Sequence, residues 1–385
     1  MGMATVKKYL ITIDNVSYYV LTSKDGSKLV KFELIKECAT HSSEHINTRQ
    51  FNDLYVLDSI HSGIGRNESN NIYNIVLSPI LKKLEINHEY IKSTDSKFIS
   101  EWAKQFKEHT KEVTIILISG DTSVSEFINS LPRVSKRNIN ILPIAMGTAN
   151  ALANSLNLNC PIDTFNKLLT QKLISNELPL YNVIFPDNSS KLFFVILSLG
   201  FHANLLHKSN DIEYNGMGVE KFQLASQEIL QNYDLNQKIS IVKACTTIIN
   251  NFAYFALINV PKLEEHYIPS PKSKLFESEL HVLGYLSNLP KDTLISKIMQ
   301  GYENQLNDNI ESAGTIYKSL QDNFCIKLPS WDGKIPRYKY EICCDGLLYN
   351  LLDFIPLDES RKDTLSIQFM GSNIKGNNIK VFSPV

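Results

Sequence analysis

The chain has 385 residues, with 39 basic and 40 acidic side chains and a formal net charge of −1. This length exceeds what one hydrophobic core usually organises, so two domains are expected. The near-neutral charge gives no general attraction to nucleic acid, and no basic tail is present to bind it. The 6 cysteines form no C-x-x-C pair and no array with histidines, which argues against a zinc site and favours reduced thiols.

The apolar runs of the sequence are short. The longest, 193–197 and 252–258, fall far below the roughly 20 residues that span a bilayer. The first residues, MGMATVKKYLITID, lack the apolar core of a signal peptide. We therefore expect a cytoplasmic protein without a transmembrane segment, whose contact with any membrane is peripheral.

Residues 8–34 alternate between apolar and polar side chains, which is the period-2 pattern of strands. Lys24-Asp25-Gly26 is a turn signal between two of these strands. The sequence therefore predicts a small β element within residues 1–50, which is more typical of a structural addition than of a site.

From residue 51 to 165, apolar strands alternate with loops and helices. The predicted strands are 55–60, 88–94, 113–119 and 139–145, and the helices that follow them are 67–84, 97–106, a segment through 127–131, and 151–156. Four repeats of strand, loop and helix indicate a parallel sheet with helices on both faces. Ligands of such sheets bind at the carboxyl ends of the strands. The loops of interest are therefore 61–66, 93–95, 119–123 and 146–150.

Strands dominate the rest of the chain. They are predicted at 178–185, 191–200, 237–245, 251–260, 278–287, 323–329, 339–346, 364–371 and 379–384, with two helices near 219–231 and 290–299. This density of strands favours an antiparallel, sandwich-like second domain. The predicted fold class is α/β: a parallel-sheet domain over 51–165, followed by a β-sandwich-like domain over 166–385. A return of the C-terminal segment to the first domain is left open.

The loop from Ser119 to Ser123 follows the most apolar strand and opens a helix. Backbone N–H groups at a helix N-terminus bind anions, and Gly120 lets a phosphate approach the chain closely. Asp121 is electrostatically unusual beside phosphate unless it handles a proton or a metal ion. The alternative is capping, because Ser123 and Glu126 have capping-box spacing and Asp121 can satisfy backbone donors.

Two further loops share this character. Met146-Gly147-Thr148-Ala149-Asn150 follows the next strand, where Gly147 permits a tight turn and Thr148 can either cap the helix or bind phosphate. Ser62-Gly63-Ile64-Gly65-Arg66 follows the first strand, and Arg66 is a candidate phosphate partner. This is not a Walker A loop, because no G-x-x-x-x-G-K-[ST] occurs. Three such loops on neighbouring strands favour a phosphate-binding edge.

The ordered motifs SGIGR, SGDTSVSEFINSL and LPIAMGTANALANSL resemble the catalytic domain of the diacylglycerol kinase and sphingosine kinase family, which is related to the NAD kinases. The family pattern contains Ser-Gly-x-Gly, Gly-Gly-Asp-Gly-Thr and Pro-x-Gly-Thr-x-Asn. The resemblance spans roughly residues 51–385 and is specific in the first part of that range. It implies an ATP-dependent lipid kinase with a nucleotide-binding α/β domain and a β-sandwich, the nucleotide lying in the cleft between them.

The resemblance also implies roles for single residues. Asp121 takes the place of the carboxylate that accepts the proton of the lipid hydroxyl. Together with Arg66 and Thr122, the expected ATP-binding residues are Ser62, Gly63, Gly65, Thr94, Ser119, Gly120, Gly147, Thr148, Asn150, Lys221 and Asp345. ATP and Mg²⁺ are the implied cofactors, and the way the metal is held stays open. The implied partner is a lipid substrate at a membrane surface, either diacylglycerol-like or sphingoid.

Two other functions stay open at this point. One is a catalytically impaired family member that binds nucleotide or lipid as a regulator, because Thr122 and Leu347 stand where the family has Gly and Glu. The other is an NAD-kinase-like enzyme with a soluble substrate. NAD kinases hold the ribose of the acceptor with an Asn-Glu pair, for which this chain has no convincing counterpart.

Overall fold

The computed structural model describes residues 4–25, 28–39, 42, 46, 53–106, 112–214, 217, 220–243, 246–302, 312–355 and 363–385. The chain divides into two compact units, Met1–Glu177 with Asn373–Val385, and Leu178–Ser372. The division after Glu177 lies later than the boundary at 165 expected from the sequence, because β8 (Leu173–Glu177) pairs with the C-terminal strand of the first unit. The expected boundary at 50 and 51 lies outside the described residues.

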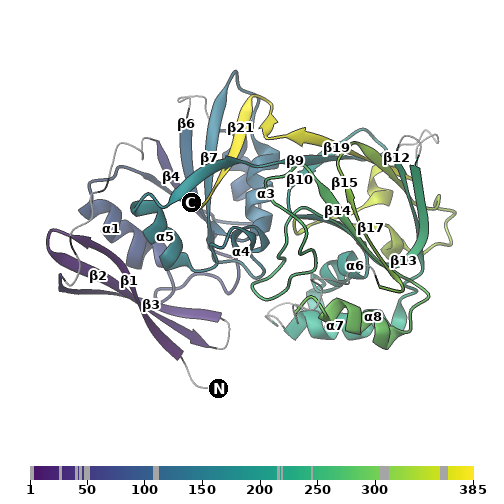
Figure 1. Cartoon of the computed structure of the whole chain (residues 1–385), viewed down its shortest axis with the longest axis horizontal. Helices are drawn as coiled ribbons and strands as arrows, with labels where there is room; N and C mark the ends of the chain where they lie inside the picture. Colours follow the sequence, from purple (N-terminus) through teal and green to yellow (C-terminus); the bar gives the residue numbers. More distant parts are fainter. Residues whose placement is uncertain are drawn as a thin grey trace. The chain divides into compact units, whose positions relative to one another are not determined.

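The N-terminal residues form their own antiparallel sheet of three strands in the first unit (Figure 1), with β1 (Ala4–Ile13), β2 (Val16–Asp25) and β3 (Lys28–Cys38). Leu10, Val20 and Phe32 are buried on its inner face. The sheet packs against helix α5 (Pro161–Leu169), where Lys8 of β1 forms an ion pair with Asp163. The predicted β element is present and is an integral part of the first unit.

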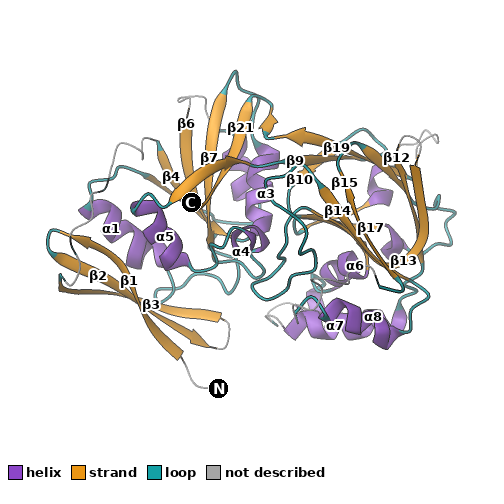
Figure 2. Cartoon of the chain, viewed as in Figure 1, coloured by secondary structure: helices purple, strands orange, loops and turns teal. Residues whose placement is uncertain are grey.

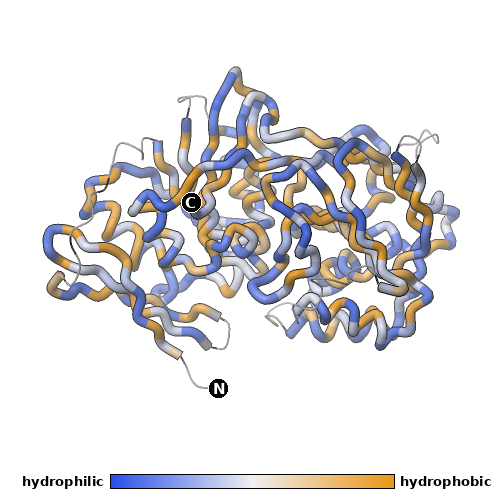
Figure 3. Tube along the Cα trace, in the orientation of Figure 1, coloured by the Kyte–Doolittle hydropathy of each residue, from blue (hydrophilic) through white to orange (hydrophobic). Residues whose placement is uncertain are grey.

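The second sheet of the first unit is the predicted parallel sheet. Its order is β20-β21-β7-β6-β4-β5, with β8 beside β21. Five strands run parallel to one another: β4 (Leu54–Asp58), β5 (Glu89–Lys92), β6 (Glu112–Ser119), β7 (Arg137–Ala145) and β21 (Asn377–Pro384). Two strands run antiparallel to β21: β8 and β20 (Asn373–Ile374). β6 is buried from Val113 to Ser119, as expected for a strand covered on both faces. Figure 3 shows apolar residues along these strands and hydrophilic residues at the loop tips.

The C-terminal segment completes this sheet. β21 lies beside β7, and the buried Arg137 donates from Nε and Nη2 to Asn377 Oδ1, at 2.9 and 2.7 Å. Asn377 Nδ2 in turn donates to Pro132 O at 2.9 Å. The last predicted strand is therefore confirmed, but as part of the first unit rather than of the antiparallel domain.

Helices cover both faces of the parallel sheet (Figure 2). They are η2 (Tyr73–Leu77, π-helical), α1 (Ser78–Lys83), α2 (Phe98–Lys104), α3 (Asp121–Ser130), α4 (Ala151–Ser155) and α5. α2 and α3 pack on each other. The prediction that the first helix begins at Asn67 is wrong. The Asn67 and Asn70 side chains close a turn there by accepting from Ser69 N and Asn67 N, and such bonds compete with helix formation.

The second unit contains one 11-stranded antiparallel sheet. Its order is β10-β9-β19-β16-β12-β13-β11-β17-β18, with β14 beside β13 and β15 beside β14. The bounds are β9 (Leu180–Ile184), β10 (Ser190–Phe193), β11 (Ile196–Gly200), β12 (Gln237–Lys243), β13 (Thr246–Ile258), β14 (Leu280–Leu286), β15 (Thr315–Leu320), β16 (Phe324–Lys327), β17 (Glu341–Cys344), β18 (Leu347–Asn350) and β19 (Thr364–Gly371). The predicted antiparallel domain is confirmed, with its strands joined in one sheet.

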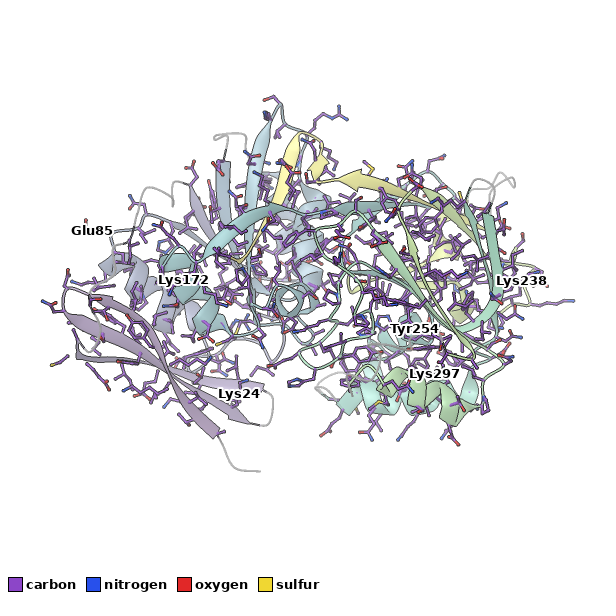
Figure 4. The ribbon with its side chains drawn as sticks, in the orientation of Figure 1. Lys24, Glu85, Lys172, Lys238, Tyr254 and Lys297 are labelled. Atoms are coloured by element: carbon purple, nitrogen blue, oxygen red, sulfur yellow. The ribbon has the colours of Figure 1, made fainter. Side chains whose placement is uncertain are left out.

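Apolar side chains from this sheet fill one core, which includes Phe193, Phe255 and Ile326. Tyr254 of β13 is 1% exposed and is labelled in the interior in Figure 4. The helices of the unit are α6 (Phe201–Lys208), α7 (Glu220–Asn232) and α8 (Lys291–Met299), with shorter 3-10 turns η3 (Ile212–Tyr214), η5 (Arg337–Tyr340) and η6 (Leu351–Phe354). α7 and α8 were predicted, whereas α6 was not. Among the described residues, no helix is long and apolar enough to cross a membrane.

Candidate functional site

Three glycine loops meet at one edge of the parallel sheet, after β4, β6 and β7. A Cβ atom on Gly147 would lie 2.4 Å from Gly120 Cα, and a Cβ atom on Gly63 would lie 2.6 Å from Met146 O. The loops therefore touch through bare backbone, and no larger residue fits at these contacts without movement. The prediction that Gly63, Gly120 and Gly147 share one end of the sheet is confirmed.

The loop after β4 turns sharply through Gly63 and Gly65, whose φ angles are +65° and +75°. Residues with a Cβ atom rarely adopt this left-handed conformation. The turn is closed by backbone bonds from Gly65 N to Ser62 O and from Arg66 N to Ile60 O, at 3.1 and 2.8 Å. Ser62 Oγ also donates to Ser59 Oγ at 2.8 Å, so the hydroxyl of Ser62 is held inward.

Several backbone donors remain open on two of these loops. Gly63, Ile64, Thr148 and Ala149 are exposed, and in the part of the chain that the structure describes their N–H groups have no protein acceptor within hydrogen-bonding distance. Successive free N–H groups on a tight loop form a concave site for an anion. This edge can therefore receive a phosphate group through the backbone alone.

Asp121 is the first residue of α3, and its carboxylate caps another helix. Its Oδ2 accepts from Ala151 N at 2.7 Å and its Oδ1 accepts from Leu152 N at 2.8 Å, at the N-terminus of α4. A carboxylate at this end of a helix is stabilised by the unpaired N–H groups and the helix dipole. Burial raises the pKa of the Asp121 carboxyl above its ordinary value, against the effect of these two hydrogen bonds.

The prediction that Asp121 can satisfy backbone donors is thus confirmed, whereas the predicted capping box of Ser123 and Glu126 is wrong. Ser123 lies inside α3 and donates to Ser59 Oγ at 3.2 Å, so no capping box with Glu126 begins the helix. An ionised carboxylate has about four acceptor positions, and the two N–H bonds leave others available to a ligand hydroxyl. The cap and the proton-accepting role of Asp121 are therefore chemically compatible.

Asn150 closes the loop after β7 with its own side chain. Its Oδ1 accepts from Gly147 N at 2.7 Å, and its Nδ2 donates to Gly147 O at 3.0 Å. Its backbone has φ +57°, a conformation that Asn adopts more readily than most residues. Thr148 lies at the exposed tip of the same loop. Asn150 therefore holds the loop in shape, while Thr148 faces solvent.

Arg66 does not stand at the open edge as expected. Its side chain is 2% exposed, and Nε lies 3.3 Å from Oδ1 of Asp58, which is fully buried. That ion contact is not aligned as a hydrogen bond. The Arg66 guanidinium instead donates to Ser62 O and Ile118 O, while Tyr90 OH donates to Asp58 Oδ2 at 3.3 Å. Arg66 is a structural cation beneath the loop, and its expected contact with phosphate stays a prediction.

The remaining expected residues of the first unit lie around the same edge. Ser119 is 5% exposed and donates from Oγ to Gly120 O at 3.2 Å. Thr122 is in the first turn of α3. Thr94 is exposed after β5 and donates to Asp95 Oδ2 at 2.9 Å. Its loop is tied to the β4 loop, because Ile60 N donates to Ser93 Oγ at 3.1 Å.

Two residues that sequence reasoning did not select organise this edge, Asp58 and Ser59. Asp58 ends β4 and pairs with Arg66, and Ser59 accepts hydrogen bonds from Ser62 of the β4 loop and from Ser123 of α3. Their signal in the sequence is a pair of polar residues directly after a buried strand, where the chain usually meets solvent. Both are at most 9% exposed.

Lys221 and Asp345 belong to the second unit. Lys221 is half-buried on α7, with Nζ 5.1 Å from the centre of the Phe222 ring. Asp345 is 1% exposed, and its carboxylate accepts three backbone bonds of 2.9 Å from Phe194, Val195 and Ile196. The structure thus places the Asp345 carboxylate inside the fold, as the anchor of a turn, and its expected ATP contact stays a prediction.

Comparisons with known proteins agree with this geometry. Residues 60–178, which contain all three glycine loops, match the family model of the diacylglycerol kinase catalytic domain, so the predicted resemblance is confirmed over these residues. No curated protein sequence matches the chain.

Among solved structures, a diacylglycerol kinase from Bacillus anthracis str. Sterne matches with a TM-score of 0.55 at 12% identity, covering 86% of this chain and 96% of that one. Two further structures from this organism match at 14% identity with TM-scores of 0.59 and 0.57, and with the same shares of each chain covered. At this identity the likeness shows a shared two-domain fold.

Proposed function

We propose that the protein is an ATP-dependent kinase that phosphorylates the hydroxyl group of a lipid, either diacylglycerol-like or sphingoid. The observation that carries this proposal is the convergence of the loops at Gly63, Gly120 and Gly147, with open N–H groups, inside the segment that matches a kinase family. Phosphoryl transfer depends mainly on positioning and on neutralising charge, which such backbone donors supply.

In this proposal each part of the edge has a task. The N–H groups of Gly63, Ile64, Thr148 and Ala149 hold the ATP phosphates, and Asp121 accepts the proton of the lipid hydroxyl. The described residues contain no cluster of three His, Cys, Asp or Glu side chains that could hold a metal ion. In this proposal Mg²⁺ would be held mainly through the ATP phosphates, as is usual for this ion at sites of phosphoryl transfer.

The contacts of Asp121 and Arg66 favour a second function, that of a regulator that binds nucleotide. Both oxygens of Asp121 accept backbone bonds, and Arg66, a cation on the same loops, is buried against Asp58. These contacts suit a protein that binds nucleotide but turns it over slowly. Such a protein would act as a regulator rather than as an efficient kinase.

One experiment separates these functions. Purified protein is incubated with radiolabelled ATP, Mg²⁺ and micelles of diacylglycerol, ceramide or sphingosine, and labelled lipid is measured beside nucleotide binding. A labelled lipid at many turnovers supports the kinase. Binding of ATP with less than one turnover supports the regulator, and the absence of both results contradicts the proposed use of the loops.

A further inference from the structure

A pocket in the second unit has a feature that the proposed function does not use. It has a volume of about 390 Å³ and is lined in part by His207 of α6, Tyr349 of β18 and Asp353 of η6. α6 packs against β17, whose first residue, Glu341, lies behind His207. The Glu341 side chain is 17% exposed and that of His207 is 20% exposed, so both groups are largely removed from water.

The hydrogen bonds of His207 fix which ring nitrogen carries a proton. Nε2 lies 3.2 Å from the carbonyl oxygen of Ile342. A carbonyl oxygen accepts only, so Nε2 must be the donor. In the neutral ring, Nδ1 then carries no proton, and it lies 3.8 Å from Glu341 Oε1. The backbone of Tyr349 on β18 is a further hydrogen-bond partner of the ring.

The carboxylate oxygen of Glu341 that lies near His207 Nδ1 is also an acceptor when Glu341 is ionised. Its Oε2 accepts from Asn204 Nδ2 at 2.7 Å, and Asn204 is itself buried and bonded to Tyr338 O. If both groups are deprotonated, the lone pairs of Nδ1 and Oε1 face each other in a poorly hydrated space. One added proton converts this repulsion into a hydrogen bond, which a small side-chain movement can close.

The charged groups around Glu341 and His207 do not relieve the repulsion between their lone pairs. Asp211, after α6, raises the pKa of Glu341, and Arg337 of η5 lowers it. Arg337 is paired with Asp353 at 2.6 Å, however, and Lys208 of α6 is paired with Asp211, Glu213 and, on α7, Glu228. Tyr233 of α7 also faces Glu341. β11 and β13 contribute Ser198 and Tyr254, which contact His202 instead.

The two groups differ in their affinity for the proton. Burial raises the pKa of Glu341 from 4.5 to about 7, whereas burial lowers the pKa of His207 below its ordinary value. Of the two groups, Glu341 therefore holds the proton in preference to the imidazole. The stabilisation from Glu341 is complete below pH 4.5 and is lost as the pH rises toward about 7.

We propose that Glu341 and His207 share one proton, and that this proton fastens α6 to β17 and thereby fixes the wall of the pocket. Above neutral pH the pair loses the proton, the contact between α6 and β17 loosens, and the pocket gains negative charge. The second unit thus contains a pH-sensitive device that is separate from the glycine loops of the first unit.

Glu341→Gln tests the device, because the Gln amide can donate to His207 Nδ1 while its oxygen accepts from Asn204. The variant should behave as the protonated form at every pH. We expect equal melting temperatures for variant and wild type at pH 4.5, and a variant that melts at least about 2–4 °C higher at pH 8.5, which corresponds to roughly 1 kcal/mol for a unit of this size. Asp322→Asn is the matched control: this exposed carboxylate of the second unit is paired with Lys243, away from the Glu341–His207 pair, and its loss should show no such crossover.

Two further measurements show whether the change in stability arises at α6 and His207. Hydrogen exchange of α6 should be faster in wild type than in Glu341→Gln at pH 8.5 and equal at pH 4.5. The His207 ring of the wild type, observed by NMR, should show a chemical-shift step near pH 7 while it keeps the signature of a neutral ring. A constant difference in melting temperature across pH, or a His207 ring that becomes an imidazolium near pH 6.5, would overturn the proposal.

Discussion

Each unit of the molecule is held at one point by an aspartate that binds the backbone of a distant segment. In the first unit, Asp121 accepts from the N-terminus of α4. In the second, Asp345 accepts from the turn between β10 and β11. Asp345 is 1% exposed, whereas Asp121 lies beside the exposed loop residues Thr148 and Ala149. The same kind of carboxylate contact therefore stabilises only the fold at Asp345, whereas at Asp121 it lies beside open backbone donors.

The backbone around the two aspartates shows the same difference. Asp345 and Gly346 have φ angles of +49° and +85° and form the two-residue turn between β17 and β18, as Asp-Gly pairs often do. That turn leaves its carboxylate enclosed. The glycines near Asp121 instead let three loops touch and leave N–H groups exposed. Motif identity alone therefore does not distinguish a ligand site from a structural anchor, but exposure of the neighbouring donors does.

The largest effect in this comparison is expected for Asp345→Ala. Three buried backbone donors would lose their acceptor, and each such loss costs about 1–3 kcal/mol. We expect the second unit to lose more than about 3 kcal/mol of stability, measured by calorimetry. Asp353→Ala, which removes a 60% exposed carboxylate, should change it by about 1 kcal/mol or less. Equal effects of the two changes would contradict the role of Asp345 as an anchor.

Gly147→Ala should have an intermediate effect on stability and a strong effect on nucleotide binding at the edge of the parallel sheet. The new Cβ would lie 2.4 Å from Gly120 Cα, so the loops must move apart, at a cost of about 1–3 kcal/mol. Gly333→Ala is the control: Gly333 has φ +82° and no atom within 4 Å of the added Cβ, so only backbone strain results. Thermal unfolding should show destabilisation of both variants, and only Gly147→Ala should lose nucleotide affinity.

The smallest effect on stability is expected for Asp121→Asn. The amide oxygen still accepts one backbone bond, so the loss should be about 1 kcal/mol. If Asp121 accepts the hydroxyl proton, turnover should fall by at least about 100-fold, within the usual range for general-base catalysis. The melting temperature and kcat are measured together. An unchanged kcat with a lowered melting temperature would leave Asp121 with the cap alone.

The parallel sheet was predictable from the sequence because its central strands β4, β6 and β7 are buried on both faces and read as nearly continuous apolar runs. The glycine loops were predictable for a related reason, since each follows such a run directly. The partner of the last strand was not predictable, because the alternating pattern of residues 379–384 suits an edge of either sheet. Only the buried contact of Arg137 with Asn377 decides that question.

Other errors of the sequence analysis also have long-range causes. The apolar run 191–200 was predicted as one strand, but Asp345 binds its middle and separates β10 from β11. Gly200, with φ +66°, then ends β11 and begins α6. Arg66 was proposed as a phosphate partner because it follows a small-residue loop after the first strand, and its buried pairing with Asp58 was missed. Local spacing cannot reveal such pairings.

The central claim, that the loops at Gly63, Gly120 and Gly147 bind a nucleotide, is tested most directly by titrating Mg-ATP into the purified protein. Isothermal calorimetry should show saturable binding in the wild type and a loss of binding in Gly147→Ala. At 100 times its dissociation constant, the ligand should stabilise the protein by about 2.7 kcal/mol, a shift visible in thermal unfolding. Neither heat nor a thermal shift at millimolar Mg-ATP, in a protein that is otherwise folded, would contradict the claim.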